Sequence, residues 1–153
     1  MDTVDKTAPR TTLLIVEDEI LPAMALRVEL EDAGYRVMDL TSRPQEALAA
    51  AGERKPDLAL VNIVLHGRAD GIALAGDLKA MGIPVLFISG QVSREKSRER
   101  VAIGSLPKPY STVDMVKAVQ YLLRHLEGDE TRPRPSGLEV FDGAGTGVEP
   151  DLV

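Results

Sequence analysis

The chain has 153 residues, of which 44% are hydrophobic, 27% charged and 3% aromatic, and its formal net charge is -6. This acidic balance disfavours a nucleic-acid partner, which would need a basic face, and the absence of cysteine excludes disulfides and thiol chemistry. The N-terminal residues lack the apolar core of a signal peptide, and no apolar run is long enough to span a bilayer. We therefore expect a cytoplasmic protein with no membrane partner.

The predicted elements alternate between short apolar runs and amphipathic stretches. A first strand over 13–16 precedes a helix that carries Ala23, Leu26 and Leu30 on one stripe and ends at Gly34. A weaker strand over 36–40 precedes a helix capped by Ser42. The third and fourth strands, 58–61 and 85–89, are each followed by a helix, over 71–81 and 93–101. A brief fifth strand at 105–106 leads into a last helix, 111–126, with a capping box.

Five strands alternating with five helices predict an α/β fold, a doubly wound parallel sheet with helices on both faces. The predicted domain spans residues 13–127. Residues 1–12 are polar and are expected to form a flexible tail. Residues 128–153 are rich in Gly, Pro, Asp and Thr and are expected to be disordered, with one apolar patch at 138–142 available for a partner.

Polar side chains follow four of the predicted strands. Their sequence positions are Glu17-Asp18-Glu19, Asn62, Ser89 and Lys108. In doubly wound sheets the functional crevice lies outside the carboxyl ends of the strands, so we expect these groups to meet. Clustered carboxylates suit Mg²⁺, and a hydroxyl with an ammonium suits the oxygens of a phosphoryl group. The pattern indicates a phosphoryl-transfer site that lacks its acceptor.

Each of these residues alone has an ordinary structural explanation. An acidic turn is usually solvated, Asn62 is a common turn former, Ser89 a common cap, and a lysine between prolines is usually a surface residue. Their joint placement at successive strand ends favours a functional site. His66 and His125 have no acidic or Cys partners at metal-ligand spacing, so we interpret them as a loop residue and a helix-end residue.

The segments LLIVEDE, PDLALVNIVL with ADG downstream, VLFISG and LPKPY, in that order, resemble a bacterial response-regulator receiver domain. The resemblance covers about residues 12–127 and implies a flavodoxin-like sheet with strand order 2-1-3-4-5. Phe87 to Gly90 also resembles the F-A-T-G motif of an alphaproteobacterial subgroup.

The resemblance implies a role for each candidate residue. Glu17 and Asp18 match the acidic pair that binds Mg²⁺, with the backbone carbonyl of Val64 as a further ligand. Ser89 and Lys108 match the residues that contact the phosphoryl group, and the bond from the lysine to the next proline is usually cis.

Two positions depart from the family pattern. Ser105 stands near the place of the aromatic switch residue, which puts signalling by the usual aromatic rotation in doubt. Asn62 stands where the family has its phospho-acceptor Asp. An amide oxygen is neutral and its nitrogen lone pair is delocalised, so Asn62 should not be phosphorylated, and Mg²⁺ binding should be weakened. We expect no catalytic residue and no enzymatic activity.

We expect a single-domain receiver in a two-component or phosphorelay pathway that acts by binding a sensor histidine kinase or a phosphotransfer protein. The alternative is a phosphorylation-independent pseudo-receiver that serves as a binding or scaffold module. A native Asn62 would make the chain such a pseudo-receiver, whereas an Asn62 that replaces Asp would lock a receiver in its unphosphorylated state. The sequence fits both origins. An Asp-nucleophile phosphatase and a flavin carrier fit poorly, because the residues after the first strand, EDEILPA, match neither site.

A homodimer through the fourth helix, fifth strand and fifth helix is also expected. Met115, Tyr121 and Leu122 lie outside the predicted core stripe of the last helix and would form an exposed apolar patch. That predicted stripe consists of Val116, Val119, Leu123 and Leu126. The charged helix over 93–101 would supply a polar rim.

Overall fold

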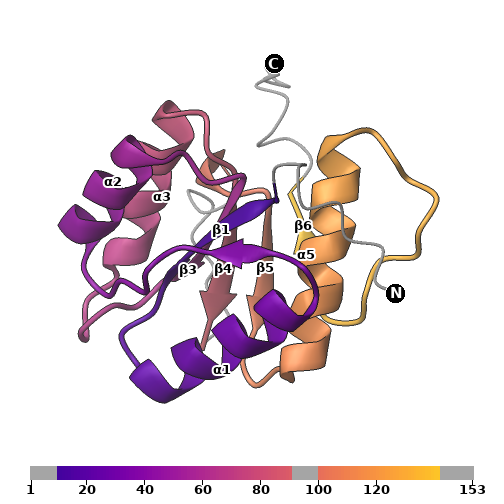
Figure 1. The fold of residues 1–153 in the computed structure, drawn as a ribbon, viewed down its shortest axis with the longest axis horizontal. Coiled ribbons are helices and arrows are strands. Elements are labelled where there is room, and N and C mark those ends of the chain that lie inside the picture. The colour runs from indigo at the N-terminus through magenta and orange to yellow at the C-terminus, as the bar shows by residue number, and fades with distance from the viewer. Residues whose placement is uncertain (1–9, 91–99, 142–153) are drawn as a thin grey trace.

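The computed structural model describes residues 10–90 and 100–141. They form one sheet in the order β2-β1-β3-β4-β5-β6 with helices on both faces (Figure 1). The elements in chain order are β1 (Thr12–Val16), α1 (Ile20–Asp32), β2 (Arg36–Val37), α2 (Pro44–Glu53), β3 (Leu58–Asn62), α3 (Asp70–Ala80), β4 (Val85–Ser89), β5 (Gly104–Pro107), α5 (Thr112–Leu126) and β6 (Glu139–Val140). The predicted flavodoxin-like order 2-1-3-4-5 is confirmed.

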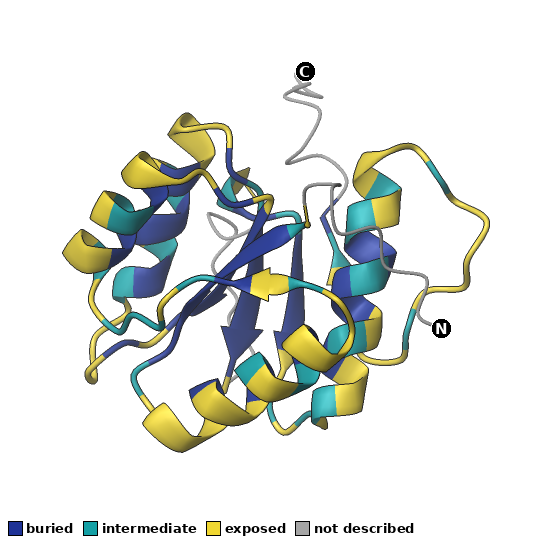
Figure 2. Cartoon of the chain, viewed as in Figure 1, coloured by how far each residue is buried: buried dark blue, intermediate teal, exposed yellow. Residues whose placement is uncertain are grey.

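The strands β1, β3 and β4 are buried along their whole length, as Figure 2 shows by their dark blue colour. Continuous apolar runs are typical of parallel strands covered on both faces. Successive side chains point to opposite faces, so the sheet separates two apolar clusters. Residues of β1 illustrate the division, because Leu13 and Ile15 join one cluster and Leu14 and Val16 join the other.

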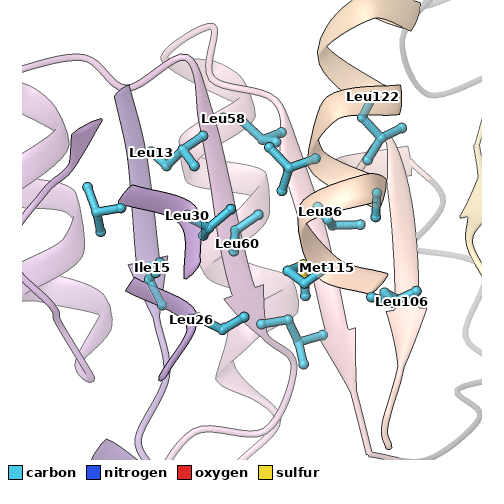
Figure 3. Packing of buried hydrophobic residues seen from close by; sticks show 14 of the residues in the cluster. Leu13, Ile15, Leu26, Leu30, Leu58, Leu60, Leu86, Leu106, Met115 and Leu122 are labelled. Carbon is cyan, nitrogen blue, oxygen red and sulfur yellow. The ribbon is translucent and has the colours of Figure 1, made fainter. Parts of the chain in front are cut away.

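The first cluster lies between the sheet and the pair α1 and α5, and Figure 3 shows part of it. Leu26 and Leu30 from α1 and Met115 and Leu122 from α5 meet strand residues such as Leu60 there. The second cluster lies under α2 and α3 and includes the fully buried Phe87. With few aromatic residues, both cores are mainly aliphatic, as the composition predicts.

The sheet has a sixth strand that the sequence did not predict. β6 pairs antiparallel with β5, and Leu138 and Phe141 at its two ends are 5% and 8% exposed. The expectation of disorder over 128–153 is therefore wrong for residues 138–141. Two alternating apolar positions beside Gly, Pro and charged residues give too short a pattern to predict a strand, and this strand is stabilised by a tertiary contact that spacing does not reveal.

The buried side of α5 also differs from the prediction. Met115 and Leu122 are fully buried and Tyr121 is 8% exposed, whereas Leu126 is 46% exposed. A helix with apolar residues on two adjacent stripes is consistent with two orientations about its axis, and periodicity alone does not choose between them. The apolar patch expected on α5 is absent, and the sequence argument for a homodimer through this helix is lost with it.

The remaining expectations concern segments outside the described ranges. The predicted helix over 93–101 falls mainly on residues 91–99, and most of the N-terminal tail falls on residues 1–9. Within the described part of the chain, no helix is long and apolar enough to cross a membrane.

Candidate functional site

The register of the parallel strands brings four polar strand ends to one edge of the sheet. Val16 is opposite Val61, Asn62 is opposite Ile88, and Ser89 is opposite Pro107. The residues that follow β1 therefore lie beside the end of β3, and Lys108 lies beside the end of β4. The structure brings together Glu17, Asp18, Asn62 and Lys108, as their sequence positions predict.

Asn62 lies at the centre of this group and is 5% exposed. Its amide nitrogen Nδ2 donates to Oε2 of Glu17 at 3.0 Å and to Oδ1 of Asp18 at 3.4 Å. One neutral donor group thus joins both carboxylates of the acidic pair. A carboxylate in the same place would have no hydrogen to donate and would add a third negative charge.

Glu17 is the most deeply buried acid of the site, at 3% exposure. Its Oε2 also accepts from the Glu19 backbone N–H at 3.1 Å, and its Oε1 lies 3.6 Å from Nζ of Lys108. Burial raises the pKa of the Glu17 carboxyl, although the Glu19 amide and the Lys108 ammonium act in the opposite direction. The Lys108 ammonium also lies 3.9 Å from Oε1 of Glu19, so its single positive charge offsets part of the negative charge of this acidic turn.

The second acid, Asp18, is held by the loop that follows β3. The backbone N–H of His66 donates to Oδ2 of Asp18 at 3.0 Å. Burial alone would raise the pKa of Asp18, but the hydrogen bond from the His66 amide acts in the opposite direction, and the pKa of this carboxyl lies below its usual value. His66, whose φ is 53°, contributes to the site through its backbone N–H. The sequence did not suggest this role.

Ser89 and Lys108 complete the edge of the site on its other side. Ser89 is 7% exposed, and its backbone carbonyl accepts from the Lys108 backbone N–H at 2.7 Å. The peptide bond between Lys108 and Pro109 is cis, as the resemblance implies. This backbone contact fixes where the lysine leaves β5 and therefore where its ammonium can reach.

Gly71 supports the site, and its role was not recognised from the sequence. A Cβ atom at this position would lie 2.3 Å from the Asn62 carbonyl oxygen and 2.7 Å from the Ile63 Cα. The Gly71 N–H donates to the Ile63 carbonyl at 2.9 Å. Only glycine lets the start of α3 approach the backbone behind Asn62 this closely. Its place at the beginning of a predicted helix, where glycine is otherwise unfavourable, is the sequence signal that could have revealed this role.

Tyr110 is a second residue that the sequence did not single out. It is partly buried beside the first apolar cluster and follows the cis proline by one residue. Burial, together with the negative charges of Glu17 and Glu19, raises the pKa of its hydroxyl to about 12. The hydroxyl therefore senses the charge of the acidic turn.

The arrangement does not fit a Mg²⁺ ion as it stands. Such an ion needs oxygen ligands directed toward it, but the Asn62 amide N–H groups are directed at the carboxylates that would bind it. Val64, whose carbonyl the resemblance implies as a ligand, is two residues past β3 and has a side chain that is 48% exposed. Among the described residues, no three acidic, His or Cys side chains are placed to hold a metal.

In this site opposite charges and hydrogen bonds partly offset one another, although Oε1 of Glu17 is buried with no hydrogen-bond donor among the described residues. The Asn62 amide bridges the acids, the Lys108 ammonium lies beside Glu17, and the His66 N–H binds Asp18. The side chain of Asn62 is an amide, which is not a nucleophile at phosphorus. The site lacks the carboxylate nucleophile that would be needed to form an acyl phosphate at Asn62.

Comparisons with known proteins show which family the chain resembles. The sequence profile of the response regulator receiver domain matches residues 13–120. The transcriptional regulatory protein PdtaR of Mycobacterium tuberculosis is 32% identical over 76% of this chain and 58% of its own length. The phyllosphere-induced regulator PhyR of Methylorubrum extorquens is 33% identical over 74% of this chain and 43% of its own length. The chain thus spans about half of these relatives.

Solved structures are also similar. The signal receiver domain of a modulated diguanylate cyclase from Desulfovibrio desulfuricans superimposes with a TM-score of 0.70, at 32% identity, over 80% of this chain and all of that chain. A CheY-like receiver domain protein from Methanospirillum hungatei has a TM-score of 0.71 at 24% identity, over 78% of this chain and 98% of that chain, and shows the shared fold. From the profile match over most of its length, the chain belongs to the response regulator receiver domain family.

Proposed function

We propose that this receiver acts in two-component signalling by binding a partner in one fixed state, without accepting a phosphoryl group at Asn62. Receiver domains are signalling modules that interact with histidine kinases or phosphotransfer proteins. The observation that carries the proposal is the Asn62 amide, which donates to both Glu17 and Asp18. An aspartate there would instead repel these acids until a cation offset their charge.

Charge is the physical basis of the fixed state. Two carboxylates about 5 Å apart at an effective dielectric of about 20 repel each other by a few kcal/mol at most. With Asn62 in place of a third acid, this repulsion is reduced and the acids are hydrogen-bonded. The Asn62 amide offers no nucleophile for phosphorylation, and its two hydrogen bonds supply part of the stabilisation that a cation would otherwise give the two acids.

Magnesium binding belongs to the same proposal. Receiver domains generally bind Mg²⁺ at their acidic pocket. Here the Asn62 side chain would have to turn its oxygen toward the ion and give up both hydrogen bonds. We infer that Mg²⁺ binds this chain weakly, with Asp18 and Glu17 as the residues that would hold it.

The first helix offers the partner surface. Four large apolar side chains of α1 are half exposed or more, namely Ile20 at 60%, Leu21 at 75%, Met24 at 50% and Val28 at 57%. The helix begins directly after the acidic turn, so this apolar surface, which we call the α1 face, borders the candidate site. A contiguous apolar surface of this kind favours association with another protein. Half-exposed Val64 and Val113 follow β3 and β5 at the same edge.

The experiment that tests the proposal is labelling with acetyl phosphate and Mg²⁺, followed by intact-mass measurement. The chain should gain no phosphoryl group at Asn62, and Asn62→Asp should gain one, because Glu17, Asp18, Ser89 and Lys108 remain in place. The matched control is Asn62→Asp combined with Lys108→Ala, which should label more slowly.

A stable label mapped to Asn62 in the unchanged chain would refute the proposal. A label on Asn62→Asp would indicate that the rest of the site retains the chemistry of a phosphorylated receiver. Failure of that variant to label, with its fold intact by circular dichroism, would favour the scaffold function, in which the whole site has lost this chemistry.

A further inference from the structure

The outer edge of β5 carries a strand from the end of the described chain. In a sheet whose other pairs are parallel, β6 pairs antiparallel with β5, with Gly104 opposite Val140 and Ser105 opposite Glu139. The Phe141 N–H donates to the Ile103 carbonyl at 2.9 Å. We call residues 137–141 the C-terminal strap. Figure 1 shows it as the outermost strand, beside β5.

The strap packs against both faces of the sheet. Leu138 is 5% exposed and belongs to the cluster under α1 and α5, while Phe141 is 8% exposed and belongs to the cluster under α2 and α3. Two residues three positions apart on a strand point to opposite faces. Leu138 and Phe141 therefore anchor the strap on either side of the β5 edge, and Val140 packs partly buried on the first side.

The β5 strand is shaped to receive this strap. A Cβ atom on Gly104 would lie 2.6 Å from the Glu139 carbonyl oxygen, so the close approach of the two backbones requires glycine. The neighbouring Ser105 is 2% exposed. Small residues at both paired positions of β5 leave room for the backbone of a sixth strand.

The segment between α5 and the strap is held at its start. Arg124 pairs with Asp129 at 3.4 Å, and the Thr131 N–H donates to Asp129 at 2.9 Å. Nδ1 of His125 lies 2.9 Å from Oε2 of Glu130. Fixing the beginning of a connection raises the effective concentration of the segment that follows it.

We propose that the β5 edge is a strand-binding site of defined specificity, occupied in this chain by its own C-terminal strap. The site takes an antiparallel strand with large apolar residues at its first and fourth positions, as in the Leu138–Phe141 segment. While the strap is bound, the edge of β5 and the adjoining side of α5 are closed to strand pairing with a second chain. An open strand edge is a template for pairing, so displacement of the strap exposes a surface for association.

A labelled peptide with the sequence of residues 136–142 tests the site in trans. The full chain with Leu138→Ser and Phe141→Ser should release its strap and bind this peptide, and the unchanged chain should bind it at least about tenfold more weakly because the tethered strap competes. The control Glu139→Gln keeps both anchors and should behave like the unchanged chain. Adding Gly104→Ala to the double variant should abolish peptide binding, since the added methyl group blocks the backbone approach.

Fluorescence anisotropy measures this binding, with circular dichroism as the check on folding. Equal peptide affinity in the unchanged chain and the folded double variant would overturn the proposal, and so would an absence of binding to that folded variant.

Hydrogen exchange of the Phe141 amide gives a second measurement that does not depend on the double variant. This amide should be protected in the unchanged chain and exchange rapidly in Gly104→Ala, while the Ile103 amide, which donates to Val85, stays protected in both. A rapidly exchanging Phe141 amide in the unchanged chain would also overturn the proposal.

Discussion

A single amide determines the electrostatics of the candidate site. The sequence predicts from Asn62 that no acyl phosphate can form there and that the acidic pair is less strained than with a third carboxylate. It does not predict that the amide nitrogen donates to both Glu17 and Asp18, because the orientation of a side chain depends on the positions of its neighbours in space. The burial of Glu17 and the contribution of the His66 backbone likewise become visible only in the folded chain.

Tyr110 provides a pH test of the electric field around the site. Burial and the charges of Glu17 and Glu19 raise its pKa from 10.0 to about 12, so the native state favours the neutral hydroxyl. This contribution to stability is fully present below pH 10 and is lost as the pH rises from 10 through about 12.

Urea unfolding at a series of alkaline pH values should therefore show a steeper loss of stability in the unchanged chain than in Tyr110→Phe. Absorbance at 295 nm should show that this substitution removes the tyrosine ionisation with the midpoint near 12. Equal stability slopes in the two proteins would contradict the assignment.

At the scale of elements, continuous apolar runs located the central strands, and their order in the chain located the polar strand ends. The spacing of apolar residues gave a wrong prediction where one spacing fits two orientations of a helix about its axis. The stripes on α5 fit two orientations, and the structure buries the one with Met115 and Leu122. It also failed at β6, where a short segment is stabilised as a strand by contacts of Leu138 and Phe141 with distant residues.

The start of α3 is expected to be intolerant of any side chain at Gly71. Gly71→Ala would place a methyl group 2.3 Å from the Asn62 carbonyl, and overpacking of this kind costs about 3 kcal/mol of unfolding free energy. Gly76→Ala in the same helix is the matched control, because its Cβ would meet only Val101 at 3.6 Å and helix propensity favours alanine by about 1 kcal/mol. Chemical denaturation measures both, and similar stabilities for the two variants would exclude the proposed close approach behind Asn62.

The α1 face makes a prediction about partner binding. Met24→Glu places a charge in the middle of this face and should weaken binding of the cognate kinase or phosphotransfer protein by about tenfold or more, since a truncated or charged interface anchor typically costs over 1 kcal/mol. Met81→Glu is the matched control, because Met81 is 36% exposed at the end of α3, on the other side of the sheet. Isothermal titration calorimetry compares them, and an unchanged affinity for Met24→Glu would place the partner elsewhere.

At the scale of the whole molecule, the described structure presents one apolar face beside the candidate site and a closed edge at β5. The α1 face is exposed, whereas the side chains of α5 that were expected to be exposed are covered. The receiver fold, its strand order and the meeting of the polar strand ends could be predicted from the sequence and its resemblance to the family. Which helix face is exposed could not be predicted from the sequence, because it depends on the rotation of α5 about its axis and on a strand from the end of the described chain.

In the proposed fixed state, the Asn62 amide holds Glu17 and Asp18 without a metal ion or a phosphoryl group. Two-dimensional NMR of the isotopically labelled chain tests it most directly, by following the Asn62 side-chain amide and the backbone amides of Glu19, His66 and Lys108 during addition of Mg²⁺ and then acetyl phosphate. These signals should stay in place at millimolar Mg²⁺ and after acetyl phosphate, while the same titration of Asn62→Asp should shift the backbone signals. A saturable shift of the Asn62 amide in the unchanged chain at micromolar Mg²⁺, or a further shift on adding acetyl phosphate, would contradict it.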